Sequence, residues 1–351
     1  MVHVSEIFST DELEKAIENG YVRVNPHPDA PLVILGYTEK AQFDRMWNDV
    51  TLNCRGLIID YDGFVVARPW KKFFNFGERP LLFDTDAPVE VTDKKDGSLG
   101  ILYRHPVTGD WAISTRGSFT SDQAIHATKL FNDKYSHIVK PLKDTTFLFE
   151  IVYPKNRIVL NYGDMDDLIL LGAVDNERGY YWGPTQAAGI LNWPGPVTEV
   201  FKYRTLNDCF SVHRENAEGL VIRSGSNMVK LKQVDYVELH RIVTNLNERS
   251  VWSQLKEGKS ARDICEMIPD EWHDWVVDVA EVLYSKYHEL ENEVTGAYAD
   301  VIHSLPGGFS RKDFALEAKK TPYMSYLFAL LDCKSISDML WDAVKPAVNN
   351  K

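Results

Sequence analysis

The sequence contains few cysteines and no long apolar run. Its cysteines are Cys54, Cys209, Cys265 and Cys333. Their wide spacing argues against a zinc site or a disulfide framework and favours a reducing compartment. The longest apolar runs, residues 168–174 and 326–331, are far too short to span a bilayer, and the N-terminus lacks the basic and apolar regions of a signal peptide. We therefore expect a soluble cytoplasmic protein, in the host cytoplasm if viral, with no membrane partner.

The chain also lacks an excess of basic residues. It carries 39 Lys+Arg against 51 Asp+Glu, a formal net charge of -12. Because contacts from lysine and arginine to phosphates dominate nucleic-acid affinity, any nucleic-acid surface must be local. The composition, 44% hydrophobic and 26% charged, is typical of a folded globular protein, and a length of 351 residues favours two domains.

Strand patterns fill the first part of the chain, and helical periods follow. Alternating apolar residues around Gly-containing turns predict hairpins near residues 54–67, 89–103 and 218–232. Residues 145–153 and 157–162 are predicted to form a further strand pair. Amphipathic, capped patterns then predict helices, the longest over 270–305. We predict an α+β domain of antiparallel sheets with flanking helices over residues 1–240, and an all-helical C-terminal domain over residues 241–351.

Isolated charged side chains interrupt the apolar strands of the first domain. Lys94 begins the turn Lys94-Lys95-Asp96-Gly97, which can hold its amine at the mouth of a pocket. The other isolated charges are Arg116, Glu150, Glu218, Lys230 and Lys232. Alternation places the two lysines of the last strand on one face. Any one such charge is more often a solvent-facing residue, but their combination is harder to dismiss.

In this order, these residues resemble the motifs of ATP-dependent RNA ligases of the phage RNA ligase 1 type, in the covalent nucleotidyltransferase superfamily. The matching stretches are the KxDG-like turn at 94–97, residues 114–118, 147–150 and 218–221, and the KxK-like 230–232. Two upstream stretches, Cys54-Arg55-Gly56 and residues 72–75, are similar to RNA ligase 1 enzymes in particular. The family often has lysine where Arg116 stands. Several ordered matches over residues 54–236 are improbable by chance.

The resemblance implies covalent transfer of AMP from ATP. Lys94 would attack the α-phosphorus, release pyrophosphate and hold AMP as a lysyl-AMP phosphoramidate. Lys230 and Lys232 would favour the neutral form of the Lys94 amine and hold the α-phosphate as charge builds up on it. Glu218 would bind Mg²⁺ or Mn²⁺, directly or through water, because such hard ions prefer oxygen donors.

The resemblance also assigns nucleotide-binding roles. Arg55 and Lys72 would hold the β- and γ-phosphates, and Arg116 would lie near the nucleotide sugar or the RNA phosphate. Glu150 would accept hydrogen bonds from the ribose hydroxyls. Tyr236 would line the pocket, although a core tyrosine is an equally good interpretation.

The expected substrate is RNA with 5′-phosphate and 3′-hydroxyl ends, single-stranded or a broken tRNA, in RNA repair, and no protein partner is predicted. The same scaffold can serve DNA ligases and mRNA-capping enzymes, so these stay alternatives. Against them, the sequence shows no zinc-ligand cysteines, no helix-hairpin-helix repeats and no OB-type strand run after Lys232. A non-catalytic nucleotide or RNA-end binding module is a third interpretation, which the intact Lys94 and KxK pair disfavour. The last interpretation is an ordinary α+β protein whose charged residues lie in turns.

Overall fold

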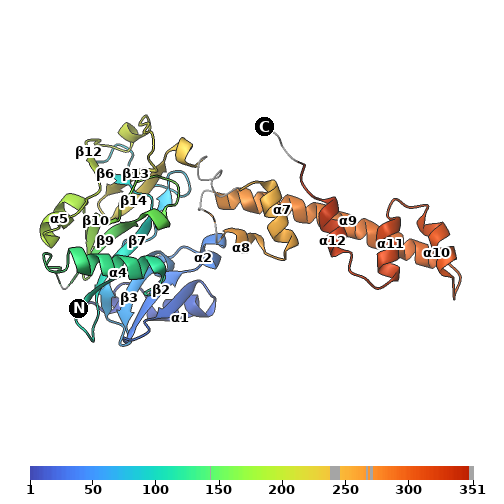
Figure 1. Ribbon diagram of the computed structural model, residues 1–351, viewed down its shortest axis with the longest axis horizontal. Helices are drawn as coiled ribbons and strands as arrows, with labels where there is room; N and C mark the ends of the chain where they lie inside the picture. Colours follow the sequence, from blue (N-terminus) through green and yellow to red (C-terminus); the bar gives the residue numbers. More distant parts are fainter. Residues whose placement is uncertain (143, 238–245, 266–267, 269–271, 348–351) are drawn as a thin grey trace. The chain divides into compact units, whose positions relative to one another are not determined.

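The computed structural model describes residues 1–142, 144–237, 246–265, 268 and 272–347 (Figure 1). The chain forms two compact units, Met1–Val243 and Thr244–Lys351. The predicted domain boundary at residue 240 lies outside the described residues, so this boundary stays a prediction.

The N-terminal unit is built on β-sheets. The first sheet has the order β1-β2-β3-β4, with β1 Val22–Pro26, β2 Leu32–Tyr37, β3 Arg55–Asp60 and β4 Val65–Ala67. The second has the order β11-β10-β9-β7-β8, with β11 Tyr181–Trp182, β10 Asp167–Asp175, β9 Thr145–Val152, β7 Ser98–Arg104 and β8 Trp111–Ser114. The third has the order β12-β6-β13-β14-β5, with β12 Val200–Phe201, β6 Glu90–Lys94, β13 Gly219–Ser224, β14 Asn227–Lys232 and β5 Phe74–Asn75. Neighbouring strands pair antiparallel except β14 and β5, which pair in parallel.

Helices flank these sheets. They are α1 Thr10–Glu18, α2 Glu39–Phe43, α3 Asp49–Asn53, α4 Asp122–Lys134 and α5 Pro184–Leu191. Side-chain caps fix the starts of α1 to α4; for example, the Ser9 hydroxyl accepts from the Glu12 N–H, and the Ser121 hydroxyl accepts from the Ala124 N–H. Helices α4 and α5 pack against the second sheet (Figure 1). The predicted α+β class, with antiparallel sheets and flanking helices, is confirmed.

Strand β9 shows how alternation orients the site. Phe147, Phe149 and Ile151 point into the core that α4 covers. Leu148 points to the opposite face, into a second core that includes Trp70 and Phe73. Since side chains alternate along a strand, Glu150 shares the face of Leu148. The sequence therefore places this charged residue between the sheets rather than beneath the helix.

The predicted strand over residues 157–162 is wrong. The chain forms a short 3₁₀ helix at Pro154–Asn156, and β9 pairs with β7 and β10 instead. The backbone N–H groups of Val159 and Leu160 donate to the Asp96 carboxylate, at 2.9 and 2.7 Å. These N–H groups therefore bond to the side chain of Asp96, which is distant in sequence, and are not available for hydrogen bonds to a neighbouring strand.

The C-terminal unit is helical, as predicted. Its helices are α7 Glu248–Lys256, α8 Ala261–Cys265, α9 His273–Ser304, α10 Arg311–Ala318, α11 Met324–Leu331 and α12 Ser337–Ala343. Helix α9 is the long predicted helix, although residues 269–271 at its expected start lie outside the described part. Buried apolar residues along α9, including Val276, Leu283, Val294 and Val301, pack against the shorter helices. Among the described residues, no helix combines the length and apolarity needed to cross a membrane.

Candidate active site

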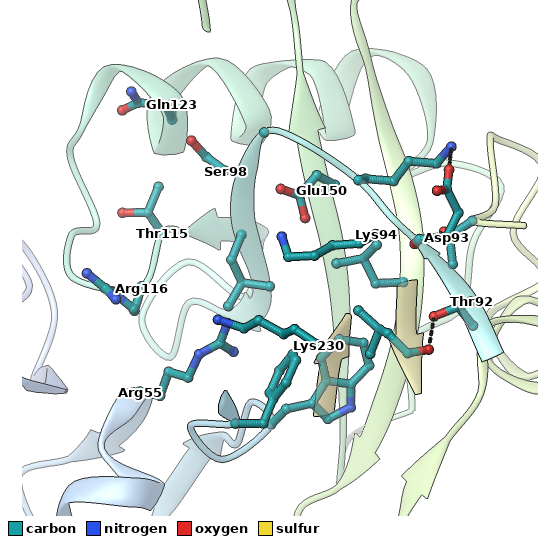
Figure 2. A pocket seen from close by; sticks show the side chains of 18 of the residues that line it. Arg55, Thr92, Asp93, Lys94, Ser98, Thr115, Arg116, Gln123, Glu150 and Lys230 are labelled. Atoms are coloured by element: carbon teal, nitrogen blue, oxygen red, sulfur yellow. Dashed lines mark hydrogen bonds and ion pairs between the residues drawn. The ribbon is translucent and has the colours of Figure 1, made fainter. Parts of the chain in front are cut away.

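A cavity of ≈ 510 Å³ opens in the N-terminal unit, beside the turn Lys94-Lys95-Asp96-Gly97, called the KxDG turn below. Its walls come from strands of all the sheets and from the start of α4. Of the predicted site residues, Arg55, Lys94, Arg116, Glu150 and Lys230 line it. In Figure 2, the Lys94 side chain points toward Glu150, while Ser98, Thr115, Arg116 and Gln123 form the opposite wall.

Strand pairing brings two lysines to one carboxylate. Gly219 lies opposite Lys94 across β6 and β13, and opposite Lys232 across β13 and β14. The preceding residue, Glu218, is 3% exposed. Its Oε1 accepts from Lys94 Nζ at 2.6 Å and from Lys232 Nζ at 3.2 Å. The register of the third sheet therefore builds a buried Lys–Glu–Lys cluster.

Glycine is required at position 219. The φ of Gly219 is +154°, and a Cβ there would lie 2.3 Å from the Leu231 carbonyl oxygen. A side chain at this position would push β14 away from β13. The close approach of these strands is what allows Lys232 to reach Glu218.

The KxDG turn is fixed by its aspartate. Asp96 is 4% exposed. One oxygen accepts from the two N–H groups of residues 159 and 160, and the other accepts from the Tyr236 hydroxyl at 2.8 Å. The Asp96 N–H donates to the Tyr162 hydroxyl at 2.9 Å. At Gly97, a Cβ would lie 2.6 Å from the Ile151 carbonyl oxygen. The turn that carries Lys94 is thus held by residues far along the chain, which restricts where the amine can point.

Tyr236 is 5% exposed and does not appear among the residues that line the cavity. Its hydroxyl donates a hydrogen bond to the Asp96 carboxylate. The predicted contact between Tyr236 and the nucleotide therefore stays a prediction. In the structure, Tyr236 instead contacts the KxDG turn through Asp96.

We expect Tyr236→Phe to lower the free energy of unfolding by about 1–3 kcal/mol, because it leaves a buried Asp96 oxygen without its donor. Urea unfolding measures the change. Tyr61→Phe is the matched control, since Tyr61 is 67% exposed, and it should change stability by less than about 0.5 kcal/mol. Equal stability of the two variants would contradict the role of the Tyr236 hydroxyl.

Glu150 has an unusual protonation equilibrium. Burial raises its pKa to about 8, and the carboxylates of Glu218 and Asp96 add to the effect, whereas Lys94 and Arg55 oppose it. At neutral pH the carboxyl group can therefore both donate and accept hydrogen bonds.

This raised pKa predicts a pH-dependent stability. The ordinary pKa of a glutamate is 4.5, so between that pH and about 8 the folded state keeps a proton that the unfolded state has lost. The stabilisation is complete below pH 4.5 and is lost as the pH rises through the folded-state pKa. Relative to Glu150→Gln, we expect the unfolding free energy of the wild type to fall by up to about 1.4 kcal/mol per pH unit in this window. Parallel pH profiles of the two proteins in urea unfolding would contradict this assignment.

Two cations occupy buried positions near the cavity. Arg55, at the start of β3, has a buried Nη1 with no hydrogen-bond partner in the described structure, and burial lowers its pKa, an effect that Arg116 reinforces. Lys72 is 6% exposed, and its ammonium lies 5.3 Å from the Tyr37 ring and 5.4 Å from the Trp47 ring. A buried guanidinium with an unused donor in a cavity wall indicates a site for an anion.

Arg116 follows β8, close to the N-terminus of α4. Its Nη1 donates to the Tyr37 hydroxyl at 2.6 Å, and its guanidinium lies 4.9 Å from the same ring. The ring holds the guanidinium in the cavity wall, where it adds positive charge.

Not every predicted residue reaches the cavity. Lys72, Glu218, Lys232 and Tyr236 are not among the residues that line it. Sequence reasoning missed several lining residues: Thr92, Asp93, Lys95, Ser98, Gln123 and Thr198. Lys95 lies within the KxDG turn, and Asp93 and Ser98 adjoin it, so their position could have suggested them, whereas nothing local singles out Thr198 or Gln123. Within the described residues, no cluster of three or more His, Cys, Asp or Glu is arranged to hold a metal.

Antiparallel sheets that enclose a cavity, with Lys94 at the KxDG turn and the KxK strand beside it, form the arrangement that the resemblance to covalent nucleotidyltransferases predicts. A family model described as RNA ligase matches residues 53–236. The chain belongs to this RNA ligase family, and the predicted resemblance is confirmed.

Three known proteins are among those similar to this chain. The RNA ligase of Rhodothermus phage RM378 is 26% identical over 388 aligned residues, which cover 86% of this chain and 85% of the relative. An archaeal ATP-dependent RNA ligase is 14% identical, with a TM-score of 0.45, over 84% of this chain and 81% of that one. A Naegleria gruberi RNA ligase mutant, solved with ATP and Mn, is 17% identical with a TM-score of 0.35. The match covers 45% of this chain and only 53% of the Naegleria chain.

Proposed function

We propose that this protein is an ATP-dependent RNA ligase that joins 5′-phosphate and 3′-hydroxyl ends through a Lys94-AMP intermediate. The observation that carries the proposal is the Lys94 amine, which lines a cavity of ≈ 510 Å³ and contacts a carboxylate shared with Lys232. A cavity of this size suits a nucleotide. Membership in the RNA ligase family supports RNA as the acceptor.

In the first step, the lone pair of the Lys94 nitrogen attacks the α-phosphorus of ATP. The nitrogen–phosphorus bond forms, the bond to the bridging oxygen breaks, and pyrophosphate leaves with the electron pair. Lys94 must lose a proton on the way, and Glu218 Oε1, at 2.6 Å, is placed to accept it. The second ammonium on that carboxylate, Lys232, counteracts its preference for a charged Lys94.

The cations around the cavity match the charge of the triphosphate. Lys230 lines the cavity together with Arg55 and Arg116. We assign Arg55 and Lys72 to the leaving phosphates, and Lys230 with Lys232 to the α-phosphate, where fixed positive charge lowers the barrier. Arg116 is assigned to the sugar or the RNA phosphate. Glu150, neutral in part at pH 7, can exchange hydrogen bonds with the ribose hydroxyls.

A divalent ion would be held at this site together with the nucleotide. Mg²⁺ keeps several waters and is bound through one or two carboxylates plus substrate phosphates, so a three-carboxylate cluster is not needed. Glu218 supplies a hard oxygen donor near Lys94. Since Glu218 Oε1 already accepts from two lysines, we propose that the phosphates of ATP hold Mg²⁺ or Mn²⁺ chiefly, with Glu218 as a ligand directly or through water.

The remaining steps use the RNA ends. The RNA 5′-phosphate attacks the phosphorus of Lys94-AMP and frees the lysine, and the 3′-hydroxyl then attacks the activated 5′-phosphate and releases AMP. We propose a single-stranded RNA or a broken tRNA as the substrate, and the cytoplasm as the compartment, where the free thiols Cys54, Cys209 and Cys265 stay reduced.

The acceptor is tested with matched oligonucleotides. Incubation with ATP and Mg²⁺ should convert a 5′-phosphorylated single-stranded RNA into circles or joined strands, detected by gel electrophoresis. The same RNA with a 5′-hydroxyl should give no product. Faster joining of the corresponding DNA, or transfer of AMP to a diphosphate-ended RNA, would favour the DNA ligase or capping alternative.

A further inference from the structure

Beside the site, one arginine ties the strand of Lys94 to the strand that follows Glu218. Arg214 Nη1 donates to the Asp93 carboxylate at 2.6 Å and to the Gly219 carbonyl at 3.3 Å. Asp93 directly precedes Lys94, and Gly219 directly follows Glu218. One guanidinium therefore links the two backbones whose side chains form the Lys94–Glu218 contact.

Arg214 is itself held in place. Its guanidinium lies 4.5 Å from the Phe201 ring, and its backbone N–H donates to the Gln233 side chain at 3.1 Å. The Gln233 N–H donates in turn to the Glu218 carbonyl at 2.9 Å. Arg214 does not line the cavity. It is thus placed to orient the reacting pair without touching the nucleotide.

The carboxylate that Arg214 contacts, that of Asp93, is buried and paired with two cations. Asp93 is 8% exposed, and its second oxygen accepts from Lys95 Nζ at 2.5 Å. A buried carboxylate with two cations has a strongly preferred geometry, because charge-assisted hydrogen bonds are short and directional. Arg214 and Lys95 together therefore fix the position of Asp93, and with it the start of the KxDG turn.

We propose that Arg214 is a positioning residue for the Lys94 nucleophile: it fixes β6 against β13 so that the amine meets the α-phosphorus. The inference rests on the proposed function and deepens it. Only formation of Lys94-AMP needs the Lys94 amine as a nucleophile. Sealing of an RNA that already carries AMP on its 5′-phosphate does not, because the 3′-hydroxyl attacks that phosphate directly.

The structure supplies a matched control in Arg223. It lies opposite Glu90 across the same two strands, at the far end of their pairing, and its Nη2 donates to the Glu90 carboxylate at 2.9 Å. Both arginines thus form an ion pair with a carboxylate of β6, Arg223 from within β13 and Arg214 from the segment that precedes β13. Their acidic partners differ in distance from Lys94 along β6, because Asp93 adjoins Lys94 and Glu90 lies at the other end of the strand.

The test compares Arg214→Lys, Arg214→Ala and Arg223→Lys in the full chain. Single-turnover formation of the AMP adduct is measured at saturating ATP, and sealing is measured with pre-adenylylated RNA. Lysine keeps the charge, but it is shorter and lacks the planar guanidinium that lies over the Phe201 ring and holds Nη1 between Asp93 and the Gly219 carbonyl. We expect Arg214→Lys to slow adduct formation about tenfold or more while sealing stays within about twofold of wild type. Arg223→Lys should leave both rates within about twofold.

Each other outcome overturns the proposal. Equal losses in adduct formation and in sealing would make Arg214 a purely structural residue. Folded Arg214→Ala should likewise lose adduct formation more than sealing. Circular dichroism checks that this variant is folded. An unchanged adduct rate in Arg214→Lys, or an equal slowing in Arg223→Lys, contradicts the positioning role. A wild type that forms no adduct contradicts the proposed function itself, and the Arg214 assignment with it.

Discussion

Replacing Lys94 with arginine should abolish transfer of AMP from ATP to the protein and leave the fold intact. Arginine keeps a positive charge beside the Glu218 carboxylate, which lies 2.6 Å from the Lys94 amine. A guanidinium stays protonated, however, and cannot act as the nucleophile. We expect the rate of joining 5′-phosphorylated RNA to fall on the order of 10⁴-fold or more. Gel-based ligation with ATP and Mg²⁺ measures this loss.

The neighbouring lysine is the control for this variant. Lys95 Nζ is paired with Asp93, and Lys95→Arg preserves that charge. It should therefore retain ligation within about tenfold of wild type. Pre-adenylylated RNA adds a second control, because Lys94→Arg should still seal it. Ligation by Lys94→Arg at a rate near that of wild type would show that another residue carries AMP.

The second large effect is expected at Glu218. Glu218→Gln keeps the shape of the side chain but leaves the ammonium groups of Lys94 and Lys232 without their shared carboxylate. Breaking a buried ion pair in this way should lower the free energy of unfolding by about 3 kcal/mol. Lys94, misplaced and without the nearby carboxylate that is proposed to accept its proton, should react about 10²-fold more slowly with ATP. Urea unfolding and single-turnover adduct formation measure the two effects.

Glu90→Gln is the matched control for Glu218→Gln. Glu90 pairs with Arg223 in the same sheet, and its side chain is 29% exposed. Because its ion pair is better solvated and distant from Lys94 along the strand, both effects should be much smaller. If Glu218→Gln formed the adduct as fast as wild type, Glu218 would have no part in the chemistry.

Local sequence patterns were sufficient for much of the fold. The hairpins at 54–67 and 218–232 formed where turn residues separate alternating apolar stretches, and β13 and β14 pair around Gly225 as expected. The hairpin predicted near 89–103 is wrong: its two strands formed, but β6 pairs with β12 and β13, whereas β7 pairs with β8 and β9 in another sheet. The strand expected over 157–162 did not form, because the Asp96 carboxylate takes the N–H groups of Val159 and Leu160. An interaction between residues more than 60 positions apart leaves no periodic signal in a local window.

The same contrast applies to the site. Residues inside recognisable motifs, such as Lys94 and Glu218, could be picked out from type and order. Their supporting contacts could not, because Tyr236 meets Asp96 from 140 residues away and Arg214 meets Asp93 from 121 residues away. Single polar residues of this kind become identifiable only when the fold brings them beside a motif.

The most direct test of this account locates the AMP on the protein. Wild-type protein is incubated with ATP and Mg²⁺, digested, and mapped by mass spectrometry, without acid that would break the phosphoramidate. The account predicts AMP on the peptide that contains Lys94, with loss of the adduct when a 5′-phosphorylated RNA is added. AMP on Lys95, Lys230 or Lys232 instead, or no adduct on any lysine, would contradict it.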